Sequence, residues 1–224
     1  MIKINLDEPL TYKNYIGRWD SNDDYYKPCE IDYVYGMHCT KILNDDILKY
    51  GLRILNIDEQ IEYVKNALIS NGTSKQITKC FLATLNECYD EEDKACRENQ
   101  ICFVLNRSAI FDEIGCEDFF KYFGGECIYR VFKFRENCII KNILSEIGKP
   151  VIIHAWVPYD SIEHYQRANI IDFINGCNLN GCEVFSNSII STDNIIKIEG
   201  VNVNELINFD NSSYDMISCP FINL

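Results

Sequence analysis

The stretch Tyr33-Val34-Tyr35-Gly36-Met37-His38 carries the strongest structural signal in this sequence. Aromatic and β-branched residues favour an extended backbone, so this stretch predicts a short strand. Asn44 can then cap a helix, and Gly51 is placed to end it. The sequence therefore predicts a strand that leads directly into a short helix.

The rest of the chain alternates between helical and extended patterns of uneven length. The predicted helices cover residues 58–72, 76–88, 117–123, 136–147 and 161–171, and the predicted strands cover residues 101–105, 126–132, 151–157, 183–185 and 195–198. The regular crossover rhythm of a parallel sheet is missing, so we predict the α+β class. The first thirty residues are polar and are predicted to form a peripheral arm.

Length and charge limit the kind of protein that the chain can be. Its 224 residues are 47% apolar and contain no linker, which favours a single domain over residues 1–224. The net charge of -13 disfavours nucleic acid as a partner, because the surface repels phosphate backbones. A local basic patch stays open as an alternative, although a solvated face is the simpler interpretation. The patch residues are Lys121, Arg130, Lys133 and Arg135.

The cysteines and the lack of long apolar runs bear on the compartment. No stretch reaches the roughly 18 apolar residues needed to span a bilayer, so we expect a soluble, cytoplasmic protein without a membrane partner. Twelve cysteines at irregular spacings indicate thiols in a reducing compartment, and not a disulfide scaffold. We expect no metal, because closed zinc sites show tighter cysteine pairs. The alternative zinc ligands are Cys88, Cys96 and Cys102, or Cys177 with Cys182.

Three segments of the chain, taken in order, carry a motif pattern. The first is Tyr35-Gly36-Met37-His38-Cys39-Thr40, followed by Ile47-Leu48-Lys49-Tyr50-Gly51-Leu52-Arg53-Ile54. The second is Phe123-Gly124-Gly125-Glu126-Cys127-Ile128-Tyr129. The third is Glu183-Val184-Phe185, with Ile195-Ile196-Lys197-Ile198 after a short connection. In this order the segments resemble the three motifs of the ADP-ribosyltransferase superfamily, in its branch of diphtheria-toxin and poly(ADP-ribose) polymerase-like proteins.

This resemblance implies a fold and a set of site residues. The fold would be two small packed β-sheets with surrounding helices and a cleft for NAD, with a helical insertion at about residues 58–121. His38, Tyr129 and Glu183 would be catalytic. His38 would donate a hydrogen bond to a ribose, Tyr129 would stack on nicotinamide, and Glu183 would stabilise positive charge that develops on the sugar. NAD would contact His38, Cys39, Thr40, Gly51, Leu52, Arg53 and Tyr129.

The function implied by the resemblance is transfer of ADP-ribose from NAD to a macromolecular target, with release of nicotinamide and without a metal. Proteins of this kind are often toxins, effectors or defence factors. The acidic surface favours a protein target over nucleic acid, and whether an inhibitory partner exists stays open. The alternatives are an NAD glycohydrolase, a non-catalytic NAD or ADP-ribose binding module, and an interaction domain with accidental motif matches.

Three further residues are not among these implied site residues. Glu126 could be a second catalytic carboxylate, although acidic residues beside a turn are common. His154 lies in the apolar run 151–157, where a hydrogen-bonded core histidine is the favoured interpretation. His164 is expected on a helix surface.

Overall fold

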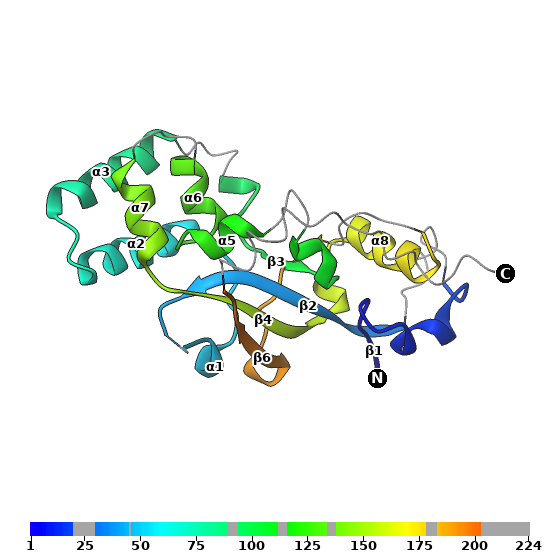
Figure 1. Ribbon diagram of the computed structural model, residues 1–224. Coiled ribbons are helices and arrows are strands. Elements are labelled where there is room, and N and C mark those ends of the chain that lie inside the picture. The colour runs from blue at the N-terminus through cyan, green and yellow to red at the C-terminus, as the bar shows by residue number, and fades with distance from the viewer. Residues whose placement is uncertain are drawn as a thin grey trace, which may run out of the picture.

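Two long antiparallel strands form the centre of the computed structural model, with β2 spanning Ile31–Ile42 and β4 spanning Lys149–Pro158 (Figure 1). The two strands pair continuously along their length. Val34 and Met37 of β2 point to opposite faces and are both buried, because each face of the sheet carries its own apolar cluster. These strands confirm the extended segments predicted from the apolar runs.

The structure describes residues 1–19, 30–44, 46–88, 94–111, 116–133, 138–177 and 183–202. Two residues named above, Arg135 and Cys182, lie outside these ranges. In the described ranges, no helix combines the length and the apolar character that a membrane span requires.

The six described strands form one sheet in the order β5-β3-β2-β4-β6, and β1 pairs with β2 outside this order. β1 runs parallel to β2, and every other pair of neighbours is antiparallel. The α+β class is therefore confirmed. The remaining strands are β1 (Ile2–Ile4), β3 (Ile101–Val104), β5 (Glu183–Ser186) and β6 (Ile195–Gly200).

The join between β2 and β3 is the weak place in this sheet. Its register consists of one pair, Met37 opposite Val104, whereas β3 and β5 pair along their whole length. At the next residue of β2, a side chain and not the backbone bonds to β3. His38 Nδ1 lies 2.8 Å from the backbone oxygen of Cys102. We call this place the fork. The expected two packed sheets are thus corrected to one sheet, because β3 and β5 stay attached to β2 at the fork.

The helices gather at opposite ends of the sheet (Figure 1). One lobe contains α2, α3, α6 and α7, which bury Val64, Phe81, Phe132 and Leu144 in a shared apolar cluster. At the other end, α8 lies near the N-terminal segment. The described α-helices are α1 (Asp46–Tyr50), α2 (Ile57–Ser70), α3 (Lys75–Cys88), α5 (Glu117–Lys121), α6 (Glu126–Lys133), α7 (Ile139–Glu146) and α8 (His164–Ile174).

Segment 58–121 is not helical throughout. It contains α2, α3 and α5, as expected for a helical segment, but also β3, which lies between β2 and β5 in the sheet. Only its first part, the hairpin of α2 and α3, stands outside the sheet in the helical lobe (Figure 1). The short apolar run 101–105 was itself predicted as a strand, and its position in the sheet makes the segment part of the core.

The predicted strand at 126–132 is wrong, since these residues form α6. In a strand, Ile128, Arg130 and Phe132 would share one face and the arginine would lie among apolar side chains. In the helix Ile128 and Phe132 lie one turn apart in the core, and Arg130 is exposed. Gly124, at φ +104°, turns the chain ahead of α6.

The N-terminal segment is not a peripheral arm either. β1 extends the sheet beside β2, and Ile4 and Leu6 are buried in the same cluster as Val34. The alternation in Ile2-Lys3-Ile4 is only three residues long, too short to stand out as a strand in a polar segment.

Candidate functional site

A large pocket opens at the fork. Its volume is about 1420 Å³, and its walls come from β2, β3, β5, α5, α6 and the segment 50–56. Pockets that bind drug-sized ligands usually measure about 300–1,000 Å³, so this one has room for a larger molecule.

All the predicted site residues line this pocket. They are His38, Cys39, Thr40, Gly51, Leu52, Arg53, Tyr129 and Glu183. They come from four separate places in the chain, namely β2, the segment after α1, α6 and β5. The structure therefore brings together residues that the sequence only suggested as a set.

His38 reaches the pocket from a different face of β2 than its neighbours do. Met37 and Cys39 belong to one apolar cluster, whereas His38 packs against Phe103 of the other, with ring centroids 5.9 Å apart. A carbonyl only accepts hydrogen bonds, so Nδ1 carries the proton that His38 donates to Cys102. Burial lowers the pKa of His38 and keeps the ring neutral.

The neutral ring changes the role expected for His38. With its proton on Nδ1, the imidazole has a lone pair on Nε2 and can accept a hydrogen bond there. The sequence interpretation had His38 donating to a ribose. The structure instead favours a histidine that accepts a hydrogen bond from a ligand hydroxyl group.

Glu183 is the first residue of β5 and stands opposite Val104, which in turn stands opposite Met37. Its carboxylate therefore points to the Met37 face, and the side chain is exposed. Among the described residues, no hydrogen bond or ion pair involves this carboxylate. Glu183 is available to a ligand that enters the fork.

Gln166 of α8 fixes the strand that carries Glu183. Its side chain is buried, accepts a hydrogen bond from the backbone N–H of Phe185 at 2.8 Å and donates to the carbonyl of Glu183 at 3.4 Å. The sequence interpretation missed Gln166. A signal exists, because Gln166, Ile170 and Ile174 are spaced four apart and all buried on one face of α8.

Tyr129 lies in an aromatic wall and not on an open strand. Its ring makes an edge contact with Phe119 at 5.7 Å and a tilted contact with Tyr122 at 5.9 Å. Only 8% of Tyr129 is exposed, whereas Phe119 is half-buried. Burial raises the pKa of Tyr129, so its hydroxyl stays protonated. Phe119 is thus the more open ring of the wall.

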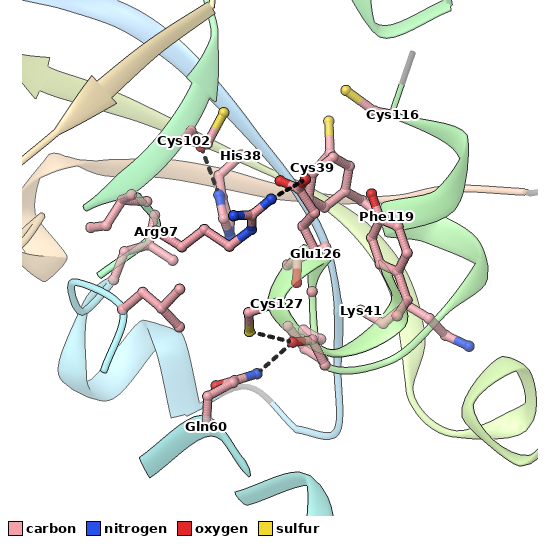
Figure 2. A pocket seen from close by; sticks show the side chains of 18 of the residues that line it. His38, Cys39, Lys41, Gln60, Arg97, Cys102, Cys116, Phe119, Glu126 and Cys127 are labelled. Carbon is pink, nitrogen blue, oxygen red and sulfur yellow. Dashed lines mark hydrogen bonds and ion pairs between the residues drawn. The ribbon is translucent and has the colours of Figure 1, made fainter. Parts of the chain in front are cut away.

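Arg97 is a second residue that sequence analysis missed. It extends into the pocket toward Glu126 (Figure 2), with Nη2 3.3 Å from Oε1 of that carboxylate. The arginine side chain is 15% exposed and the Glu126 side chain 46%. No local pattern marks Arg97, because it lies in an irregular segment between α3 and β3.

Gly51 has a structural reason to be glycine. Its φ is +74°, and a Cβ atom there would lie 2.2 Å from the backbone oxygen of Ile190. Leu52 pairs with Ile190 in an isolated bridge, which holds the segment after α1 against the rest of the fold. Arg53 follows and lies over the ring of Tyr50, with its guanidinium 5.5 Å from the ring centroid.

The pocket is close to neutral although the chain is strongly acidic. Its cationic side chains are Lys41, Arg53, Arg97, Lys121 and Lys141, and its carboxylates are Glu59, Glu117, Asp118, Glu126 and Glu183. Five positive charges against five negative ones contrast with the net charge of -13 for the whole chain. An anionic ligand therefore meets less repulsion in the pocket than the net charge of the chain suggests.

Lys41 lies beneath the pocket and ties two helices to β2. Its Nζ donates to the backbone oxygens of Ser145 at 2.6 Å and Lys121 at 3.4 Å. Burial lowers its pKa to about 8. Of the predicted basic patch, Lys121 belongs to the pocket, whereas Arg130 lies on the exposed side of α6.

Several thiols also line the pocket, and they are not arranged for a metal. A hydrogen bond with Cys116, followed by burial, raises the pKa of Cys39. Burial raises the pKa of Cys127 to about 12. Among the described residues, no group of three or more histidine, cysteine or acidic side chains could hold a metal ion. Because their pKa values are raised, Cys39 and Cys127 are protonated and are poor nucleophiles.

In comparisons with known proteins, no family model, no curated protein and no solved structure matches this chain. The pocket and the residues that line it are therefore the basis on which a function can be assigned.

Proposed function

We propose that this protein binds NAD in the pocket at the fork and transfers ADP-ribose to a macromolecular target, with release of nicotinamide. One observation carries the proposal. His38, Tyr129 and Glu183, selected from three distant sequence segments by their resemblance to ADP-ribosyltransferase motifs, line the same pocket. The fold would then be a variant of the ADP-ribosyltransferase fold in which the two halves of the sheet meet at the fork.

The size and charge of the pocket support a dinucleotide. A volume of about 1420 Å³ exceeds what a single small ligand needs. The basic side chains of Arg53, Lys121 and Lys141 offer partners for a diphosphate, and the aromatic wall at Phe119 offers a face for a flat ring.

The chemistry assigns separate tasks to the catalytic residues. Breaking the bond between nicotinamide and ribose develops positive charge on the sugar, and the carboxylate of Glu183 stabilises that charge. His38 accepts, at Nε2, a hydrogen bond from a ribose hydroxyl and so positions the ribose ring. Tyr129 packs against Phe119 in the aromatic wall. Either ring of this wall can contact nicotinamide. NAD is the only cofactor in this scheme, and it is consumed as substrate.

The acidic surface makes a protein target more suitable than nucleic acid, and the roles of toxin, effector or defence factor belong to this proposal by analogy. NAD glycohydrolase activity is the second candidate function. The observation that favours it is the exposure of Glu183, because water can reach the carbon that Glu183 faces.

The test is nicotinamide release from NAD by the purified protein, measured for the wild type, Glu183→Gln and Glu62→Gln. Glu62 is a matched control, because it lies on α2 outside the pocket in an exposed pair with Lys65. We expect release by the wild type and the control, and loss of about 10³-fold in Glu183→Gln. If NAD raises the Tm of the wild type but no nicotinamide is released, the result favours the non-catalytic NAD-binding module. If the wild type releases no nicotinamide and NAD does not change its Tm, the proposal is refuted.

A further inference from the structure

Two carboxylates border the pocket from different elements. Glu183 begins β5 and Glu126 begins α6, and both line the pocket. Only Glu183 was assigned a task above. The position of Glu126 therefore needs its own explanation.

The ion pair with Arg97 sets the direction of Glu126. The guanidinium lies 3.3 Å from the carboxylate and is itself mostly buried, so it restricts where the carboxylate can lie. The Glu126 side chain is 46% exposed, and the ion pair with Arg97 directs its carboxylate toward the pocket (Figure 2).

Cys102 lines the pocket together with both carboxylates. Burial raises the pKa of the Cys102 thiol, and the negative charges of Glu183 and Glu126 both add to this effect. Cys102 lies on β3 beside Glu183's strand, at the fork. The pocket thus has one carboxylate on the sheet side and one on the helix side of this thiol.

We infer that Glu126 is a second catalytic residue, the general base that takes the proton from the attacking nucleophile. This inference rests on the proposed function. It also requires an acceptor that loses a proton when it attacks, and we take this acceptor to be a hydroxyl group or water. Thiolates and carboxylates need no such base.

The step balances as follows. The bond between the anomeric carbon and the nicotinamide nitrogen breaks, and its electron pair leaves with nicotinamide, which becomes neutral. A lone pair of the acceptor oxygen forms the new bond to the same carbon. The proton of that oxygen passes to the Glu126 carboxylate and then to solvent. Glu183 stabilises the sugar cation, so each carboxylate has one task, as in glycosidases.

The test uses sodium azide as a nucleophile that needs no deprotonation. Nicotinamide release and the product from NAD are measured for the wild type, Glu126→Gln, Glu183→Gln and Glu62→Gln, each with and without azide. Without azide, we expect Glu126→Gln to lose about 10²- to 10⁴-fold in release, the range for a general base. With azide, release by Glu126→Gln should recover and the product should be ADP-ribosyl azide.

Glu183→Gln should stay inactive with azide, because an added nucleophile does not replace the charge that stabilises the sugar. Glu62→Gln should equal the wild type under both conditions. If Glu126→Gln releases nicotinamide at the wild-type rate, the inference is wrong and the proposed function stands. A slow Glu126→Gln that azide does not rescue also overturns the inference, since Glu126 would then act before the nucleophile attacks. If the wild type releases nothing, the proposed function fails and the inference with it.

Discussion

A histidine and a glutamate from different strands occur at two places in this sheet, and the two pairs are arranged differently. Near β6, His154 Nε2 lies 3.1 Å from Glu199, and His154 Nδ1 lies 2.6 Å from the hydroxyl of Tyr35. At the fork, His38 bonds to a backbone carbonyl instead, and Glu183 is exposed.

The environments explain the difference. Glu199 also binds Arg107 at 2.6 Å and Lys197 at 3.0 Å, and the hydrogen bond from Arg107 is the main reason why its pKa falls to about 2. Every polar group of that network has a partner, which is what a buried histidine in a sheet requires. At the fork the sheet opens, so the pocket separates groups that would otherwise pair. The same residue types thus stabilise the fold in one place and stay available to a ligand in the other.

The largest expected effects come from removing one carboxylate in each place. Glu183→Gln should reduce nicotinamide release about 10³-fold and change the free energy of unfolding by less than about 0.5 kcal/mol, since the side chain is exposed. Glu199→Gln should leave the rate per folded molecule unchanged and lower the free energy of unfolding by about 1–2 kcal/mol, because three charged or polar partners lose a carboxylate.

The measurement is urea denaturation together with the NAD assay on both variants. Glu199→Gln should also lower the Tm by roughly 2–6 °C for a chain of this size. If Glu183→Gln were the less stable variant, Glu183 would be part of the structural network and the comparison would fail.

Acid should lower the free energy of unfolding because both His38 and His154 become protonated. Burial is the main reason why the pKa values of His38 and His154 lie below the ordinary value of 6.5. In the unfolded chain both take up protons near pH 6.5, whereas in the folded protein they do so only at lower pH. Stability is therefore fully present above about pH 6.5 and is lost as the pH falls through this value. Glu199 adds a further loss between its ordinary pKa of 4.5 and about 2.

Each histidine can contribute up to about 1.4 kcal/mol per pH unit in that window. We expect the free energy of unfolding, measured in urea between pH 7.5 and 5.5, to fall less steeply in His154→Asn and in His38→Asn than in the wild type. Only His38→Asn should also weaken NAD turnover. An unchanged slope in both variants would show that the two rings take up protons at the same pH in the folded and unfolded states, and the expectation of buried, neutral histidines would be wrong.

Local patterns in the sequence were enough for part of the fold. The periodic segments predicted α2 and α3, and the apolar run 151–157 predicted β4, because each signal depends on neighbouring residues. The three catalytic candidates also came from the sequence, and the structure places them around one pocket. Their roles in catalysis stay predictions.

The remaining features depend on contacts between distant segments. The fork exists because β3 pairs with β2 at one position only, and no local pattern records a pairing between strands so far apart. The sequence predicts a strand for α6 because Ile128 and Phe132 fit both the strand period and the helix period, and only the exposed position of Arg130 in the structure decides between them. Arg97 reaches Glu126 through tertiary structure alone, so sequence reasoning could name Glu126 but not its partner.

The smallest expected effects are those of removing one hydroxyl group, from Tyr35 beside His154 or from Tyr129 at the pocket. Tyr35→Phe removes the hydroxyl that meets Nδ1 of buried His154, and an unsatisfied buried acceptor should lower the free energy of unfolding by about 1 kcal/mol. Tyr129→Phe keeps the ring that packs against Phe119 and Tyr122, so stability and NAD binding should both stay close to the wild type. Urea denaturation and the shift in Tm caused by NAD measure both variants. If Tyr129→Phe lost NAD turnover while remaining stable, the hydroxyl itself would contact the substrate, and the aromatic wall would be more than a surface for stacking.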